Sequence, residues 1–263
     1  ATQRFLEHRF AQVFPQAGAA QHAAWARAHL DMLACELLDA MALDRMGRAD
    51  GPQLSLQGWE HMVRLKEEGR GFILVLNHFD RLLAAPIALA RRGVRLNNIT
   101  MPLGLDANLD YRQRDFLTRK VGTFTRIIGG QWRSTEQSLR PVHESLRAGE
   151  GWIILADAWG PEFSRLRQHR FLNGRLQIPT GIERLARATG AALVQAVTYT
   201  DSPGRLRIEA ERLDDNPGRA IDQVIQRLDH DVRERPWAWW HWGLWDQMWR
   251  PDHPSGASGG GIQ

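Results

Sequence analysis

Residues 71–78, GFILVLNH, decide the fold of this chain. A glycine opens an uninterrupted apolar run at 72–76, and the polar pair Asn77-His78 ends it. A short run of this kind is typical of a strand that is buried on both faces of a parallel sheet. A second run, WIILA at 152–156, ends in the same way at Asp157. The two runs predict central strands of an α/β sheet.

Helical and strand patterns alternate along the rest of the chain. We expect helices at 19–46, 57–69, 82–92, 111–121, 134–149 and 180–189, and further strands near 97–101, 192–200 and 206–213. In the first helix, apolar residues recur mainly at three- and four-residue spacing and predict a stripe that faces the core or a membrane: Trp25, Leu30, Leu33, Leu37 and Met41. The alternation favours a mostly parallel sheet flanked by helices on both faces.

The composition is that of an ordinary globular protein, with 263 residues of which 43% are hydrophobic and 24% charged. We expect one domain over residues 1–253, made of an N-terminal helical part (1–60), an α/β core (71–213) and a Trp-rich helical part (217–250). The Gly- and Ser-rich tail 254–263 is expected to be disordered. Cys35 lies in an apolar run and is predicted to be buried in a helix.

The positive charge of the chain comes almost entirely from arginine. The net charge is +4, and Lys66 and Lys120 are the only lysines. Arginine favours phosphate and carboxylate partners, although a GC-rich genome would produce the same composition. No apolar stretch is long enough to span a bilayer and no signal peptide is visible, but the chain begins with Ala, so an N-terminal anchor stays possible.

Polar residues that directly follow buried strands are the first candidates for a functional site, because ligands of open α/β sheets bind beyond the carboxyl ends of the strands. The first run is followed by Asn77, His78 and Asp80, and the second by Asp157 and Glu162. Imidazole titrates near neutral pH, so His78 is a candidate general base.

Several segments, taken in order, resemble the lysophospholipid acyltransferase (LPLAT) superfamily, and within it the bacterial lipid A biosynthesis (late) acyltransferases. The similar segments are Phe14-Pro15 before an apolar helix, residues 71–78, 146–157, FLNG at 171–174, 179–191, and the Trp-rich end near 235–237. The resemblance implies an LPLAT-like fold and a His base, oriented by an acid five residues later, that activates an acceptor hydroxyl or amine for attack on an acyl thioester.

The same resemblance implies an acyl carrier protein or CoA thioester as donor and a lipid-like acceptor. We expect no metal, no other cofactor and no nucleic acid. The resemblance also implies a location at the cytoplasmic face of the inner membrane, or in the cytoplasm with peripheral membrane contact. Two alternatives stay open: a non-catalytic homologue that binds a lipid or a protein partner, and acyl transfer to a small metabolite or to water.

The sequence departs from this pattern at the acid. The position five residues after His78 is Leu83, so Asp80 and Asp157 compete to orient the imidazole. Asp80 could instead cap the helix that follows it, and Asp157 could be a structural carboxylate. A literal His-to-Asp spacing of five does occur at His241 and Asp246, but no buried strand precedes it, so we interpret it as a decoy.

The remaining candidates are substrate-binding residues that follow the two strand ends and could hold donor or acceptor phosphate: Asn77, Arg81, Glu162, Arg165, Arg167 and Arg170, with Arg175 nearby. A solvated loop is the alternative for the arginines. The Trp cluster at 237–249 predicts either a membrane-interface belt or a terminal segment packed on the core. The chain carries no Gly-x-Ser-x-Gly elbow, Walker loop or His-Glu-x-x-His helix, which argues against the corresponding hydrolases.

Overall fold

The structure is a computed structural model that describes residues 2–48, 50–102, 110–202 and 204–252. Its helices are α1 (Thr2–Val13), α2 (Ala19–Met41), α3 (Leu43–Met46), α4 (Glu60–Glu67), α5 (Ala84–Arg91), α6 (Tyr111–Ile128), α7 (Arg140–Arg147), α8 (Gly181–Thr189), α9 (Pro217–Glu234), η1 (Pro236–Ala238), η2 (His241–Gly243) and α10 (Trp245–Met248). Its strands are β1 (Gln53–Gln57), β2 (Phe72–Leu76), β3 (Leu96–Thr100), β4 (Gly129–Ser134), β5 (Gly151–Leu155), β6 (Leu166–Phe171), β7 (Gly174–Pro179), β8 (Ala192–Ser202), β9 (Arg205–Arg212) and β10 (Trp249–Pro251).

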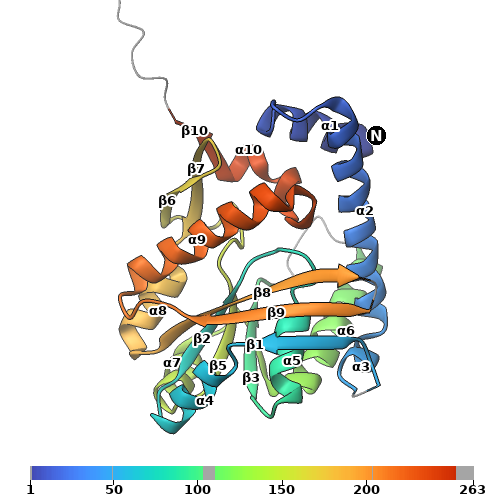
Figure 1. Cartoon of the computed structure of the whole chain (residues 1–263). Coiled ribbons are helices and arrows are strands. Elements are labelled where there is room, and N and C mark those ends of the chain that lie inside the picture. The colour runs from blue at the N-terminus through green and yellow to red at the C-terminus, as the bar shows by residue number, and fades with distance from the viewer. Residues whose placement is uncertain (1, 49, 103–109, 203, 253–263) are drawn as a thin grey trace, which may run out of the picture.

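The main sheet is mostly parallel and confirms the predicted α/β fold of a single domain. Among the described residues its strand order is β1-β9-β8-β2-β5-β3-β4. The β8–β9 pair is antiparallel and the other pairs are parallel. A smaller antiparallel sheet has the order β10-β7-β6. Helices cover the main sheet, and α1 and α10, from the two ends of the chain, lie close together (Figure 1).

Strand β2 occupies the centre of the sheet, as the sequence predicts. Its five residues are all buried, and alternate side chains enter two different cores. Ile73 and Val75 pack with α1, α7, α8, α9 and the Trp-rich end, whereas Phe72, Leu74 and Leu76 pack with α4, α5 and α6. Successive side chains of a strand point to opposite faces, so a strand covered on both sides must be apolar throughout.

Gly71 lets this strand begin close against α7. A β-carbon at position 71 would lie 2.0 Å from the carbonyl oxygen of Leu146, a distance that no side chain tolerates. The glycine before the apolar run therefore has a steric cause.

Two helix predictions need correction. The helix expected from Ser134 begins at Arg140 instead, because Ser134 ends the edge strand β4, which pairs with β3. The helix expected over 57–69 covers only Glu60–Glu67, because Gln53–Gln57 is a strand that pairs with β9. The predicted disordered tail, 254–263, lies outside the described residues.

Helix α2 faces the core with a different stripe from the one predicted. It ends at Met41, and Leu37 and Met41 are 52% and 71% exposed. Cys35, predicted to be buried, is also exposed. The buried positions include His29 and Glu36, whose polar groups have partners: His29 Nδ1 lies 2.8 Å from the Trp237 carbonyl oxygen, and Lys120 Nζ donates to Glu36 at 2.8 Å.

The Trp-rich end packs on the core, which decides between the two predicted alternatives for its central residues. Trp239 and Trp242 are 0% exposed and Trp245 is 4% exposed. Phe10 of α1 meets the Trp242 ring edge-on, with 5.1 Å between ring centroids. None of the described helices is long and apolar enough to cross a membrane.

Candidate active site

The site lies where two parallel neighbours, β2 and β5, end together. Leu76 pairs with Leu155, and the Ala156 N–H donates to the Leu76 carbonyl at 2.8 Å. The next residues on each strand are Asn77-His78 and Asp157. The adjacency of the two strands, not the local sequence of either one, therefore brings His78 and Asp157 side by side.

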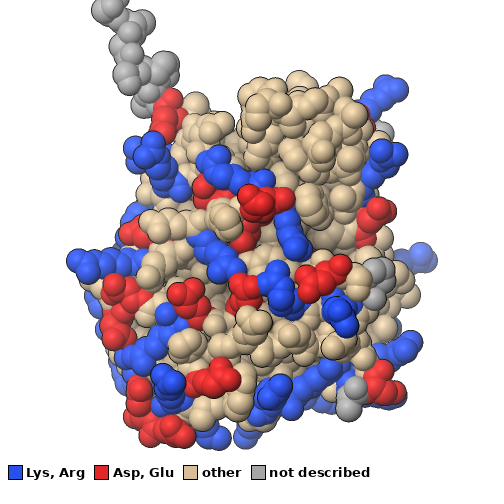
Figure 2. Space-filling model, viewed as in Figure 1, with Lys and Arg blue, Asp and Glu red and all other residues tan. Residues whose placement is uncertain are grey.

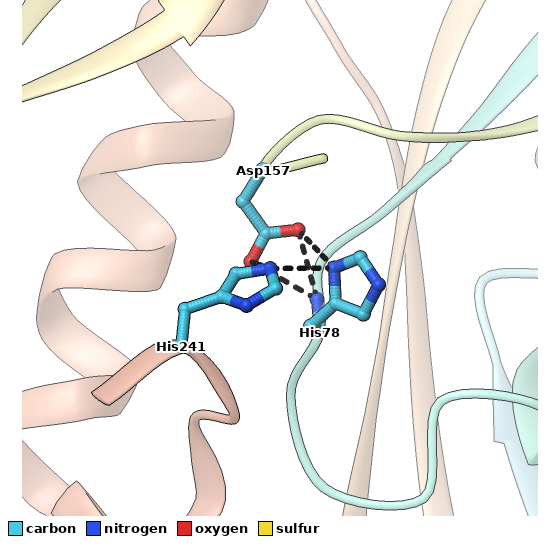
Figure 3. A group of neighbouring side chains, drawn as sticks. All are labelled: His78, Asp157 and His241. Carbon is cyan, nitrogen blue, oxygen red and sulfur yellow. Dashed lines mark hydrogen bonds and ion pairs between the residues drawn. The ribbon is translucent and has the colours of Figure 1, made fainter. Parts of the chain in front are cut away.

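Asp157 is held against His78 by four hydrogen bonds. His78 Nδ1 lies 2.9 Å from Asp157 Oδ1, and the His78 backbone N–H donates to both carboxylate oxygens, at 3.0 and 3.1 Å. The Trp239 indole N–H donates to Oδ2 at 3.0 Å. A neutral His78 that donates from Nδ1 keeps a lone pair on Nε2, which points away from Asp157 (Figure 3).

Asp157 is a buried anion. It is 0% exposed, and burial alone would raise its pKa. The positive charge available on His78 and His241, with the hydrogen bonds from His78 and Trp239, outweighs burial and holds the pKa of Asp157 well below its usual range. The carboxylate is therefore ionised at neutral pH, as an acid that stabilises an imidazolium must be.

His241 is the third member of the cluster, and the sequence interpretation left it out. Its Nε2 lies 2.9 Å from His78 Nδ1 and 3.8 Å from Asp157 Oδ2 (Figure 3). Burial lowers the pKa of His241 to about 4; Asp157 opposes this shift and His78 adds to it. His241 is therefore neutral near pH 7.

Pairing between the loop after β2 and the Trp-rich end brings His241 to the site. Asp80 N–H donates to the Ala238 carbonyl at 2.7 Å, and Trp240 N–H donates to the His78 carbonyl at 2.9 Å. The Trp240 indole also donates to the Asp80 carbonyl at 2.9 Å. These bonds fix the backbone of His78 from a segment more than 150 residues away in sequence.

Asp80, the other candidate acid, is turned away from the imidazole. Its carboxylate accepts from the Thr200 N–H and hydroxyl, both at 2.7 Å, and from the Arg81 N–H at 2.9 Å. Its backbone φ of 48° is unusual for a non-glycine residue, although Asp tolerates it. Asp80 is not the N-cap of α5 either, since that helix begins at Ala84. It ties the His78 loop to β8.

The literal motif partner of His241 is also engaged elsewhere. Asp246 accepts from the Arg9 guanidinium of α1 at 2.9 Å and does not orient His241. Leu83, at the position where the resemblance implies an acid, packs against the apolar core. His241 thus belongs to the cluster, while the His241–Asp246 pairing is a coincidence of spacing.

Among the described residues, the side chains predicted to bind substrate make no hydrogen bond or ion pair with the His78 side chain. Asn77 is 6% exposed and lines an internal cavity of about 10 Å³. Arg81 pairs with Asp39 of α2. Arg167 pairs with Asp222 at 2.5 Å.

The remaining predicted binding residues lie at the surface. Glu162, Arg165 and Arg170 are exposed, and Arg175 pairs with Asp252 at 3.1 Å. None of the hydrogen bonds or ion pairs among the described residues joins any predicted arginine to His78. Binding roles for these residues stay predictions.

The fold and the site together define an α/β protein with a histidine–carboxylate pair at the carboxyl ends of adjacent parallel strands, an arrangement suited to general base chemistry. A family model described as "Bacterial lipid A biosynthesis acyltransferase" matches residues 4–244, and the chain belongs to this family. The resemblance seen in the sequence is thereby confirmed.

One curated relative supports the same assignment. A protein of Haemophilus influenzae named "Lipid A biosynthesis acyltransferase" is 23% identical over 185 residues, which are 68% of this chain and 54% of that protein. The chain thus spans about half the length of this relative.

Proposed function

We propose that this protein is an enzyme that transfers a fatty acyl group from an acyl thioester to a hydroxyl or amine of a lipid-like acceptor. His78 is the general base and Asp157 the residue that positions it. The observation that carries the proposal is the 2.9 Å contact between His78 Nδ1 and the buried Asp157 carboxylate. Membership of an acyltransferase family supports the reaction class.

In the proposed reaction the two ring nitrogens of His78 have different roles. The acceptor O–H or N–H donates its proton to Nε2 of His78 while the acceptor oxygen or nitrogen attacks the thioester carbonyl carbon. The C–S bond then breaks, and the imidazolium returns its proton to the departing thiolate. Asp157, held at Nδ1, stabilises the imidazolium between these steps. A positioned base of this kind contributes about 10²–10⁴-fold to the rate.

Asp157 takes the place of the acid that is replaced by Leu83. The family pattern implies a carboxylate on the same loop as the histidine, whereas here the carboxylate comes from the end of β5. Its N–H donors, His78 and Trp239, fix both oxygens. This geometry favours an enzyme over a non-catalytic homologue.

The donor we propose is the thioester of acyl carrier protein or CoA, and the location is the cytoplasmic face of the inner membrane with peripheral contact. Exposed leucines and a methionine on α2, at positions 33, 37, 38 and 41, would suit a lipid surface. Charged residues of both signs spread over β8 and β9, whereas mainly uncharged residues lie over α1 (Figure 2).

Lipid mass spectrometry tests the proposed function. Cells that lack the gene are complemented with the wild type, with His78→Ala, or with His230→Gln, a control change at an exposed histidine of α9. We expect one acylated lipid species to disappear without the gene and to return with the wild type and His230→Gln but not with His78→Ala. An unchanged lipid profile, or full rescue by His78→Ala, would contradict the proposal.

A further inference from the structure

Three side-chain ligand atoms converge at the proposed base, and one of them, His241 Nε2, has no role in the acyl-transfer mechanism. His78 Nδ1 lies 2.9 Å from Asp157 Oδ1 and 2.9 Å from His241 Nε2, and His241 Nε2 lies 3.8 Å from Asp157 Oδ2. His78 and Asp157 follow the ends of β2 and β5, and His241 lies in the Trp-rich end (Figure 3). Among the described residues, they form a group of His and carboxylate donors close enough to share one metal ion.

A single proton lies among the three ligand atoms that meet here. Neutral imidazole carries a single N–H. If His78 Nδ1 carries the proton, that N–H faces two acceptors, Asp157 Oδ1 and the Nε2 lone pair of His241, each at 2.9 Å. If Nε2 of His241 carries the proton, its carboxylate acceptor is 3.8 Å away, beyond hydrogen-bond range. Two nitrogens and a carboxylate oxygen therefore face one small region and share a single proton.

The spacing suits a divalent cation. Two ligands about 2.0–2.1 Å from a zinc ion lie roughly 2.9–3.6 Å apart for angles between about 90° and 120°. Two of the three separations, both 2.9 Å, are at the lower end of this range and the third, 3.8 Å, is slightly above it. The His78 backbone and the Trp239 indole already orient the carboxylate, as outer-shell donors do in metal sites.

We propose that a zinc-type divalent cation binds to Nδ1 of His78, the carboxylate of Asp157 and Nε2 of His241, and that its binding switches off His78 as a base. The second half of this inference rests on the proposed function. When Nδ1 coordinates the ion, the single proton of the neutral imidazole moves to Nε2, so that nitrogen becomes a donor and cannot accept a proton from the acceptor. The ion keeps a fourth position for water.

Direct binding of Zn²⁺ tests the site independently of activity. The proteins carry Cys35→Ser, because Cys35 is exposed and its thiol would compete for the ion. Calorimetric titration compares this parent with His241→Gln and with His230→Gln, the exposed control. We expect one equivalent of Zn²⁺ for the parent and the control, and a loss of affinity of about 100-fold or more for His241→Gln, beyond the 10–100-fold typical of outer-shell changes. Absent binding, or equal affinity in all three proteins, would overturn the site.

A spectroscopic measurement guards against a His241→Gln protein that fails to fold. X-ray absorption of the zinc-loaded parent is expected to show two imidazole ligands and oxygen donors. An environment with fewer than two imidazole ligands would overturn the inference without any His241 variant.

Transfer assays separate this inference from the proposed function. We expect Zn²⁺ to inhibit acyl transfer by the parent and a chelator to restore it. Transfer that Zn²⁺ leaves unchanged or accelerates would overturn the switch while the proposed function stands. Zinc binding at the site in a protein that shows no transfer would overturn the proposed function while the metal site stands.

Discussion

Replacing Asp157 by Asn tests the arrangement of the site most sharply, because it keeps the shape of the side chain and removes its charge. Both carboxylate oxygens now accept hydrogen bonds: Oδ1 from the backbone and ring of His78, and Oδ2 from the same backbone N–H and the Trp239 indole. An amide has one oxygen and one NH₂ group, so in either orientation its NH₂ faces an N–H donor.

The expected losses follow from these contacts. A buried donor left without an acceptor costs about 1–3 kcal/mol, out of a typical domain stability of about 5–15 kcal/mol, so most of the variant stays folded. If the NH₂ faces His78 Nδ1, the imidazole proton moves to Nε2 and the base is lost. If it faces Trp239, the imidazolium still loses the charge that stabilises it. We expect kcat to fall about 10²–10⁴-fold.

The assay measures thiol release and acylated product at equal concentrations of folded protein, with circular dichroism and thermal melting as controls for folding. Asp80→Asn, at the competing carboxylate, serves as the comparison. It should lower the melting temperature and leave kcat nearly unchanged, because Asp80 contacts Thr200 rather than His78. An Asp157→Asn protein that is folded and keeps kcat within about threefold of the wild type would refute the role of Asp157.

Three further changes test other parts of the structure. Asp246→Asn should leave kcat within about threefold and lower the melting temperature, because exposed Asp246 pairs with the buried guanidinium of Arg9 rather than with His241. Thr200→Val should lower the free energy of unfolding in urea by about 1 kcal/mol, because buried Asp80 loses one donor. His241→Gln should flatten the pH dependence of stability between pH 6.5 and about 4. The pKa of His241 in the folded protein, about 4, lies below its ordinary value of 6.5. Between these pH values the unfolded wild type binds a proton at His241 and the folded protein does not. The free energy of unfolding therefore falls by up to about 3 kcal/mol as the pH drops through this window.

Each of these expectations has a contrary outcome. A large loss of kcat in Asp246→Asn would restore the literal His-to-Asp motif as a dyad. Unchanged stability in Thr200→Val would mean that the Thr200 hydroxyl bond to Asp80 contributes nothing net. Urea titrations of His241→Gln and the wild type with equal slopes against pH would show that His241 is not held neutral by burial, since the other histidines are common to both proteins.

The fold was predictable where local pattern determines structure. The uninterrupted run Phe72–Leu76 can be stable only between two apolar layers, and it is the central strand. Helix α2 shows the limit of this reasoning. Its buried face includes Glu36, whose partner Lys120 lies 84 residues away, so the apolar spacing alone selected residues that are exposed.

Two of the three residues of the site, His78 and Asp157, were predictable from the sequence. The sequence placed His78 and Asp157 after two buried strands, and their contact follows once those strands are neighbours. His241 reaches His78 across 163 residues, through backbone bonds between the Trp-rich end and the loop after β2. No sequence pattern around His241 indicates that pairing, and its five-residue spacing to Asp246 suggests the wrong partner.

The central claim is that His78 takes a proton from an acyl acceptor. The measurement that tests it most directly is single-turnover transfer of a fatty acyl group from a carrier-protein or CoA thioester to the acceptor identified by lipid mass spectrometry. Wild type and His78→Gln are compared at equal folded concentration. We expect transfer by the wild type and a rate about 10²–10⁴-fold lower for His78→Gln. Equal rates for the two proteins would contradict it.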